Sequence, residues 1–108
     1  MHHYRQHYRQ HYNKIYTFIG NYNGRPIYKY LSQFTGDLHQ FYKAFIKWDE
    51  FKFGEFDQMA WIIMGSDEYG TRIRFVSFSD VNDPRLAEDW KYINNEMQLI
   101  DAPDLYLA

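Results

Sequence analysis

The sequence contains no cysteine, which excludes a disulfide-stapled mini-protein and a zinc module with cysteine ligands. It also contains no apolar run near the ~20 residues that a helix needs to cross a bilayer, so we expect no membrane partner. Aliphatic residues are scarce, with only two valines and six leucines. This scarcity disfavours a core of leucine-rich helices.

Aromatic residues are abundant instead: 11 tyrosines, nine phenylalanines and three tryptophans make up 21% of the chain. Aromatic side chains fit best on pleated, half-buried strand surfaces, so the composition indicates β-structure. A length of 108 residues fits a single domain and is enough to bury one core without disulfides or metal ions.

Residues 3–14 form a near-repeat with a period of four: His3-Tyr4-Arg5-Gln6, His7-Tyr8-Arg9-Gln10 and His11-Tyr12-Asn13-Lys14. On a helix, residues four apart would share a face, whereas on a strand the histidines and arginines would lie opposite the tyrosines. No N-cap residue precedes the repeat and no aliphatic stripe runs through it. We therefore interpret residues 1–13 as an extended N-terminal arm.

Residues 14–108 are typical of a single β domain, in which short strands alternate with turn signals such as Asn23-Gly24. The expected strands lie at residues 14–19, 26–31, 39–48, 59–64, 71–78, 91–93, 97–100 and 105–107. In the strand at 71–78, Arg72 and Arg74 would share one face and Ile73 and Phe75 the other. We expect a polar loop at 49–57 and one helical turn at 85–90. The predicted fold is mainly β: a small antiparallel sandwich or partly open barrel of seven to eight short strands, with the N-terminal arm.

Several elements between Tyr16 and Leu107 share their order with a known kind of module. They are Asn23-Gly24-Arg25-Pro26-Ile27-Tyr28, then Trp61-Ile62-Ile63-Met64-Gly65, then Pro84 followed by Trp90. This order resembles short repeat modules in secreted proteins of marine algae and invertebrates. The resemblance implies a small extracellular β-module of unclear function, with no catalytic residues to carry over. The chain departs from the pattern at residues 51–57, an apparent insertion, and in its lack of cysteine.

Charge is unevenly distributed along the chain. Residues 1–36 contain five basic residues and no acidic ones, whereas residues 37–108 contain seven basic and fourteen acidic residues. A basic head and an acidic body favour contact between them, within one molecule or between copies. The net charge of −2 argues against a nucleic-acid partner, since dedicated binders carry a strongly basic face.

These features predict a non-enzymatic, self-assembling structural or matrix-type protein. In this hypothesis the arm adds as a strand to the sheet of a neighbouring copy, which gives a homo-oligomer or a filament. Its tyrosines would anchor the contact, and its arginines would meet the acidic turns of the neighbour. The candidate residues of this arm are His3, Tyr4, Arg5, His7, Tyr8, Arg9, His11 and Tyr12.

Two further hypotheses remain open. The first is a glycan- or anion-binding β-module that uses exposed aromatic residues, with Trp48, Trp61 and Trp90 as candidates. The second, ranked well below, is a small hydrolase, although no nucleophile motif or phosphate loop is present. A divalent transition metal could bind His7 and His11 if they lay on a helix, but Arg5 and Arg9 would repel it. We therefore expect no cofactor.

Overall fold

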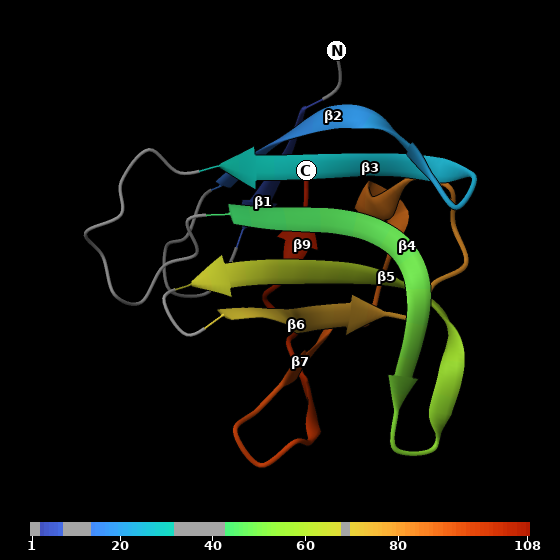
Figure 1. The fold of residues 1–108 in the computed structure, drawn as a ribbon, viewed down its shortest axis with the longest axis vertical. Helices are drawn as coiled ribbons and strands as arrows, with labels where there is room; N and C mark the ends of the chain where they lie inside the picture. The colour runs from blue at the N-terminus through green and yellow to red at the C-terminus, as the bar shows by residue number, and fades with distance from the viewer. Residues whose placement is uncertain (1–2, 8–13, 32–42, 68–69) are drawn as a thin grey trace.

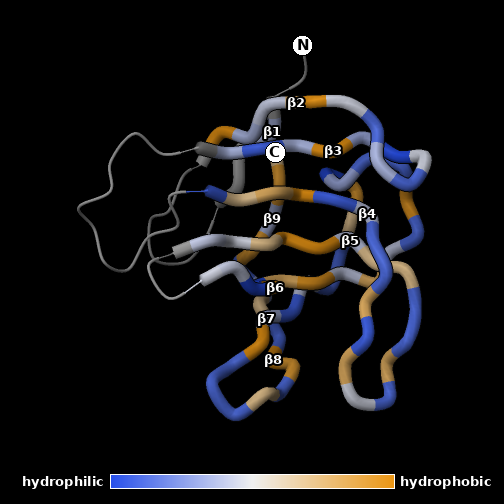
Figure 2. The backbone as a smooth tube through the Cα atoms, in the orientation of Figure 1, coloured by the Kyte–Doolittle hydropathy of each residue, from blue (hydrophilic) through white to orange (hydrophobic). Residues whose placement is uncertain are grey.

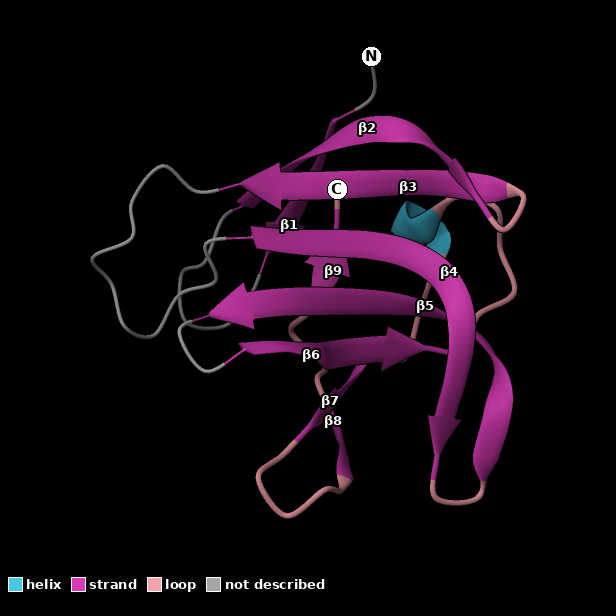
Figure 3. Cartoon of the chain, in the orientation of Figure 1, coloured by secondary structure: helices cyan, strands magenta, loops and turns pink. Residues whose placement is uncertain are grey.

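The computed structural model describes residues 3–7, 14–31, 43–67 and 70–108, and its fold is mainly β, as the sequence predicts (Figure 1). Within these ranges, nine strands form one sheet, and one 3-10 turn, η1 (Pro84–Leu86), lies beside it (Figure 3). The strands are β1 (His3–His7), β2 (Lys14–Tyr22), β3 (Arg25–Leu31), β4 (Lys43–Phe53), β5 (Phe56–Asp67), β6 (Gly70–Ser77), β7 (Lys91–Ile93), β8 (Leu99–Asp101) and β9 (Tyr106–Leu107).

Strands β1 to β8 form an antiparallel meander, and the last strand, β9, pairs with the first. The order of the sheet is β8-β7-β6-β5-β4-β3-β2-β1-β9, so its two edges are β8 and β9. Only residues 102–105 connect these edges, and a chain spans at most ~3.5 Å per residue. The sheet must therefore curl until its edges lie close together, while β8 and β9 do not pair with each other. The result is a curled antiparallel sheet that is not closed into a barrel, which agrees with the predicted mainly β fold.

The concave side of the curled sheet encloses the main core. Alternate residues of β4 and β5 point into it, and Trp48 lies directly opposite Trp61 with ring centroids 5.8 Å apart. The whole cluster of buried residues is aromatic-rich: Tyr4, Tyr16, Tyr28, Ala44, Ile46, Trp48, Trp61, Ile63, Phe75, Trp90, Ala102, Leu105 and Leu107.

Two turns decide where the long hairpins end. Asn23 and Gly24 have φ angles of 53° and 80°, which confirms the predicted two-residue hairpin turn. The prediction of a polar loop at residues 49–57 is wrong, because strands β4 and β5 continue through this segment. Phe53 pairs with Phe56 across a second two-residue turn, which contains Gly54 at φ 57°. The expected helical turn is shorter than predicted and lies earlier, as the 3-10 turn η1, which the Asp83 side chain caps by accepting from the Arg85 N–H.

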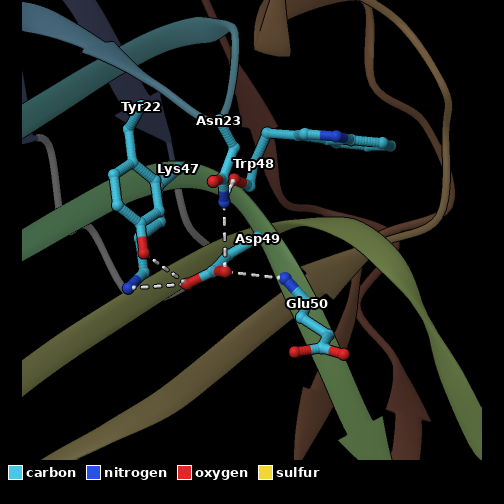
Figure 4. A network of polar contacts seen from close by, with 6 residues as sticks. All are labelled: Tyr22, Asn23, Lys47, Trp48, Asp49 and Glu50. Atoms are coloured by element: carbon cyan, nitrogen blue, oxygen red, sulfur yellow. Dashed lines mark hydrogen bonds and ion pairs between the residues drawn. The ribbon is translucent and has the colours of Figure 1, made fainter.

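Asp49 fixes the β2–β3 turn to β4 (Figure 4). Its carboxylate accepts hydrogen bonds from Asn23 Nδ2 at 3.2 Å and from the Glu50 N–H at 2.8 Å. Lys47 Nζ lies 3.0 Å from the other oxygen, to which the Tyr22 hydroxyl also donates at 3.4 Å. Burial alone would raise the pKa of Asp49. The hydrogen bond and positive charge of Lys47, together with the hydrogen bond from the Glu50 N–H, instead lower this pKa below its usual range.

Strand β1 lies inside the sheet of its own chain. It pairs with β2 along residues 3–6 and with β9 at residues 6 and 7. Tyr4 is only 4% exposed, and its ring packs against Tyr28 with centroids 4.1 Å apart. The Arg85 guanidinium covers the Tyr4 ring at 4.6 Å and also pairs with Asp83. The extended conformation is confirmed for residues 3–7, but as an integral strand; residues 8–13 of the predicted arm lie outside the described residues.

The packing of Tyr4 gives a direct test of this placement. Tyr4→Ala should lower the free energy of unfolding by about 3–5 kcal/mol, the usual cost of deleting a buried aromatic ring. Tyr4→Phe keeps the ring and loses only the hydroxyl hydrogen bonds, so about 1 kcal/mol is expected. Urea titrations would measure both. Tyr106→Ala, at a position that is 52% exposed, is the control with little effect. A Tyr4→Ala variant as stable as this control would contradict the placement of β1.

Stability should also depend on acid pH through Asp49 and Asp83. Burial raises the pKa of Asp83, but the hydrogen bonds from Arg85 outweigh it, so both carboxyls have pKa values below their usual range. A carboxyl whose pKa is lower in the folded state stabilises the protein at pH values above its unfolded pKa of ~3.9. This stabilisation is lost as the pH falls through the folded-state pKa. Urea titrations should thus show stability falling below pH ~4. In the double variant Asp49→Asn/Asp83→Asn, the free energy of unfolding should fall less steeply with decreasing pH. An unchanged slope would show that these two carboxyls do not cause the acid dependence.

Candidate functional site

A cleft of about 330 Å³ lies between two hairpins that project from the sheet. Figure 1 shows the β4–β5 hairpin and the β7–β8 hairpin extending side by side beyond β6. The cleft is lined by Phe51, Lys52, Phe53, Arg72, Ile73, Arg74, Ile93, Asn94, Asn95 and Met97, which come from the end of β4, from β6 and from the β7–β8 hairpin.

The pairing of β4 explains why the first hairpin projects. Strand β3 pairs with β4 only at residues 43–46, and β6 pairs with β5 only at residues 61–67. The outer half of the β4–β5 hairpin therefore has no further strand beside it and bends away from the sheet (Figure 1). Figure 2 shows hydrophilic and hydrophobic residues alternating along this half.

A second apolar cluster forms the floor of the cleft. Phe51 is 1% exposed and packs between Phe53 and Phe78, each with its ring centroid 5.7 Å away. The cluster also contains Ala60, Ile62 and Val76, with Phe53, Met64, Ile73, Phe78, Ile93 and Leu99 partly buried against it. This cluster uses the outward-facing residues of β5 and β6, so the sheet buries apolar side chains on both of its faces here.

A β-bulge places β6 along the cleft. Ile63 pairs with Phe75 while the next residue, Met64, pairs with Ile73, so Arg74 is the additional residue. Ile73 therefore joins the second cluster and Phe75 the main core. The prediction that Ile73 and Phe75 share one face is wrong, because a regular alternation does not allow for the bulge.

The cleft is cationic. Lys52, Arg72 and Arg74 contribute three positive charges to its lining, and no carboxylate is among the described residues that line it. Lys52 Nζ lies 3.3 Å from Glu50 outside the lining, but both side chains are at least 60% exposed, so water and salt screen this pair. The lining thus combines positive charge at the walls with an apolar floor.

The β7–β8 turn supplies the polar end of the cleft. Asn94 is held in place because its Oδ1 accepts hydrogen bonds from the Glu96 and Gln98 N–H groups, both at 2.9 Å. Its Nδ2 donates to Gln98 Oε1 at 3.0 Å. Asn94 therefore orders the turn that presents Asn95 and Met97 to the cleft.

The sequence-predicted ligand aromatics lie elsewhere. Trp48, Trp61 and Trp90 are 7, 0 and 3% exposed, so the prediction that they are exposed is wrong. Alternation alone marks one face of a strand without telling which side is concave. Arg25 covers the Trp48 ring at 3.7 Å, and Trp61 Nε1 donates to the Val81 carbonyl at 2.7 Å, so both indoles have structural roles.

The N-terminal candidates are only partly described. Tyr4 belongs to the main core, and His3, Arg5 and His7 lie on the same strand, β1. Tyr8, Arg9, His11 and Tyr12 lie outside the described residues, so a metal site at His7 and His11 stays a prediction. Within the described ranges, no group of three or more His, Cys, Asp or Glu residues could hold a metal ion.

No protein-family model, curated protein or solved structure matches the chain. The resemblance to secreted β-modules therefore stays a prediction. In the part of the chain that the structure describes, no helix is long and apolar enough to span a membrane.

Sequence reasoning missed most of the cleft. Arg72 and Arg74 were predicted as strand cations, Asn94 and Asn95 as a break between strands, and Met97 as the first residue of a strand that in fact begins at Leu99. None of these, nor Lys52, was predicted to line a site. The alternation Phe51-Lys52-Phe53 was the available signal: it is strand-like, although acidic residues around it made the segment resemble a loop.

The burial of the tryptophans predicts their fluorescence. Because all three indoles are at most 7% exposed, emission should be blue-shifted and acrylamide should quench it weakly until the protein unfolds. Unfolding in urea should raise the quenching constant several-fold. Strong quenching of the folded chain would show that at least one indole is accessible. N-acetyltryptophanamide is the fully exposed reference.

Proposed function

We propose that the protein is a non-enzymatic binding module that holds an anionic ligand with an apolar or sugar body in the cleft between its two hairpins. The observation that carries this proposal is the lining itself: among its described residues, three cations occur together with buried or partly buried phenylalanine and isoleucine and with no carboxylate. A ligand of this class carries a carboxylate, sulfate or phosphate group.

The chemistry of the lining explains the choice of ligand. An arginine guanidinium offers parallel N–H donors that match a planar oxyanion, and charge-assisted hydrogen bonds of this kind are stronger than neutral ones. Lys52 adds a point charge from β4. The floor around Phe51 and Ile73 would remove the apolar body of the ligand from water, which adds affinity without directional demands.

Two observations favour binding over the other hypotheses. The described residues of the lining include no serine, histidine or carboxylate, the groups that hydrolysis would use as nucleophile or general base. Residues 3–6 already pair with β2, and residues 6 and 7 pair with β9. Strand addition by this segment to a neighbouring sheet would first have to break those pairs.

A sulfated disaccharide and its unsulfated parent provide a matched pair of probes. Isothermal titration calorimetry should detect binding of the sulfated form only. Binding should weaken as salt is raised above about 0.1 M, because the Debye length, ~10 Å at that concentration, then becomes shorter. In Arg72→Gln/Arg74→Gln the affinity should fall at least ~10-fold, since each lost charge-assisted hydrogen bond is worth that much. Lys91→Gln, which removes a cation outside the cleft lining, is the control and should bind normally.

Equal binding of the two disaccharides would overturn the anionic ligand class. Unchanged affinity in the double arginine variant, with a circular dichroism spectrum like that of the wild type, would instead overturn the cleft as the site. Inorganic sulfate alone should compete weakly, because it reaches the cations and leaves the apolar floor unused.

A further inference from the structure

The outward side of β2, β3 and β4 carries a second cationic surface, distinct from the cleft. We call it the lysine face, and it consists of Ile15, Ile19, Lys29, Lys43, Phe45 and Lys47. Their neighbours in sequence, such as Tyr16, Tyr28 and Ile46, point into the main core, so these residues point away from it. Ile15 and Ile19 are 52 and 51% exposed, which is unusual for isoleucine.

The lysines of this face are arranged around aromatic rings. Lys29 Nζ lies 5.9 Å and Lys43 Nζ 5.3 Å from the centroid of the Phe45 ring, on neighbouring strands. Lys47 Nζ lies 5.3 Å from the Tyr22 ring and pairs with Asp49. Among the described residues, no carboxylate lies within ion-pair distance of Lys29 or Lys43.

The tip of the β4–β5 hairpin has the opposite character. We call residues 55–59 the acidic tip: Glu55 and Asp57 are exposed there, and no described cation pairs with either. Phe56 and Met59 are 39 and 37% exposed beside them. Negative charge and apolar surface thus occur together at the tip, as positive charge and apolar surface do on the lysine face.

The two surfaces cannot meet within one molecule. Strand β4 carries Lys43 at its start and leads to the acidic tip at its end, and a strand rises ~3.3 Å per residue. The eleven residues of β4 therefore separate Lys43 from the tip by roughly 30 Å along the strand. Any contact between the two surfaces has to be made with another copy of the chain.

We propose that the lysine face of one copy docks the acidic tip of a second copy. Lys29 and Lys43 would face Glu55 and Asp57, and the exposed isoleucines would cover Phe56 and Met59. Because the two surfaces differ, each copy keeps one unused surface after docking, so the assembly grows as a chain or closes as a ring. Exposed ion pairs contribute little individually and are screened by salt, so the assembly is weak and sensitive to salt.

Sedimentation velocity over a range of about 0.01–1 mM chain, in low and high salt, tests the assembly. In low salt the weight-average mass should rise above 13.3 kDa with concentration and continue past twice that value. High salt should lower the weight-average mass toward that of the monomer. A mass of 13.3 kDa at every concentration in low salt would overturn the proposal, and so would a plateau at the dimer that salt does not affect.

Charge reversal locates the contact. Lys29→Glu/Lys43→Glu and Glu55→Lys/Asp57→Lys should each sediment as monomers, because like charges then meet at every contact. An equimolar mixture of the two variants should assemble again, since each face now matches the tip of the other variant. Glu88→Lys/Glu96→Lys changes net charge as much as the tip variant does and leaves both surfaces intact, so it is the control that should still assemble.

The mixture decides the outcome. If it stays monomeric while both variants keep the wild-type circular dichroism spectrum and urea midpoint, the proposed contact is wrong. If the control loses assembly as completely as the tip variant, net charge and not the local contact is responsible, and the proposal also fails. None of these measurements uses a ligand, so they are independent of binding in the cleft.

Discussion

The short link between the two edges of the sheet is the constraint on which the structure depends. Strands β8 and β9 lie at opposite ends of a nine-stranded order, yet only residues 102–105 join them. A flat sheet of nine strands at ~4.8 Å spacing would hold these edges far beyond the reach of that link. The sheet therefore curls, and a hydrogen bond from the Ala102 N–H to the Trp90 carbonyl at 2.9 Å ties the link to the start of β7. Curling also lets the concave side of the sheet bury Tyr16, Tyr28 and Trp61, which come from β2, β3 and β5 and are at most 1% exposed.

The same curl creates the cleft. Closing the concave side leaves apolar residues on the outward side of β5 and β6, among them Ile62 and Val76, and these need cover of their own. The free half of the β4–β5 hairpin supplies Phe51 and Phe53, while the β7–β8 hairpin supplies Ile93 and Leu99. Two separate hairpins cannot cover a curved surface as one continuous layer. The cleft lies where they leave the cover incomplete, and cations from β4 and β6 line it.

The sequence was informative where a pattern is local. The aromatic run predicted a strand at residues 39–48, of which 43–48 are described and form part of β4, and Asn23-Gly24 predicted the turn between β2 and β3. Each signal depends only on neighbouring residues. The bulge at Arg74 could not be predicted, since it exists only in the pairing of Ile63 and Met64 with β6. The cleft was out of reach for the same reason: residues 51–53, 72–74 and 93–97 meet only after the sheet has curled. Burial of the tryptophans likewise depends on which side of each strand becomes concave.

Charge connects the cleft and the proposed assembly through one element. The division between a basic head and an acidic body in the sequence does not survive folding, because Lys29 from the first part lies beside Lys43 from the second around a single ring. The β4–β5 hairpin carries Lys52 and Phe51 of the cleft and, a few residues further, Glu55 and Asp57 of the acidic tip. This hairpin half is held by fewer strand neighbours than any other part of β4 or β5. If the proposed ligand drew this half toward the β7–β8 hairpin, it would also move the acidic tip, which the same half carries. Thermodynamic linkage would then require ligand binding and docking to alter each other's free energy by the same amount.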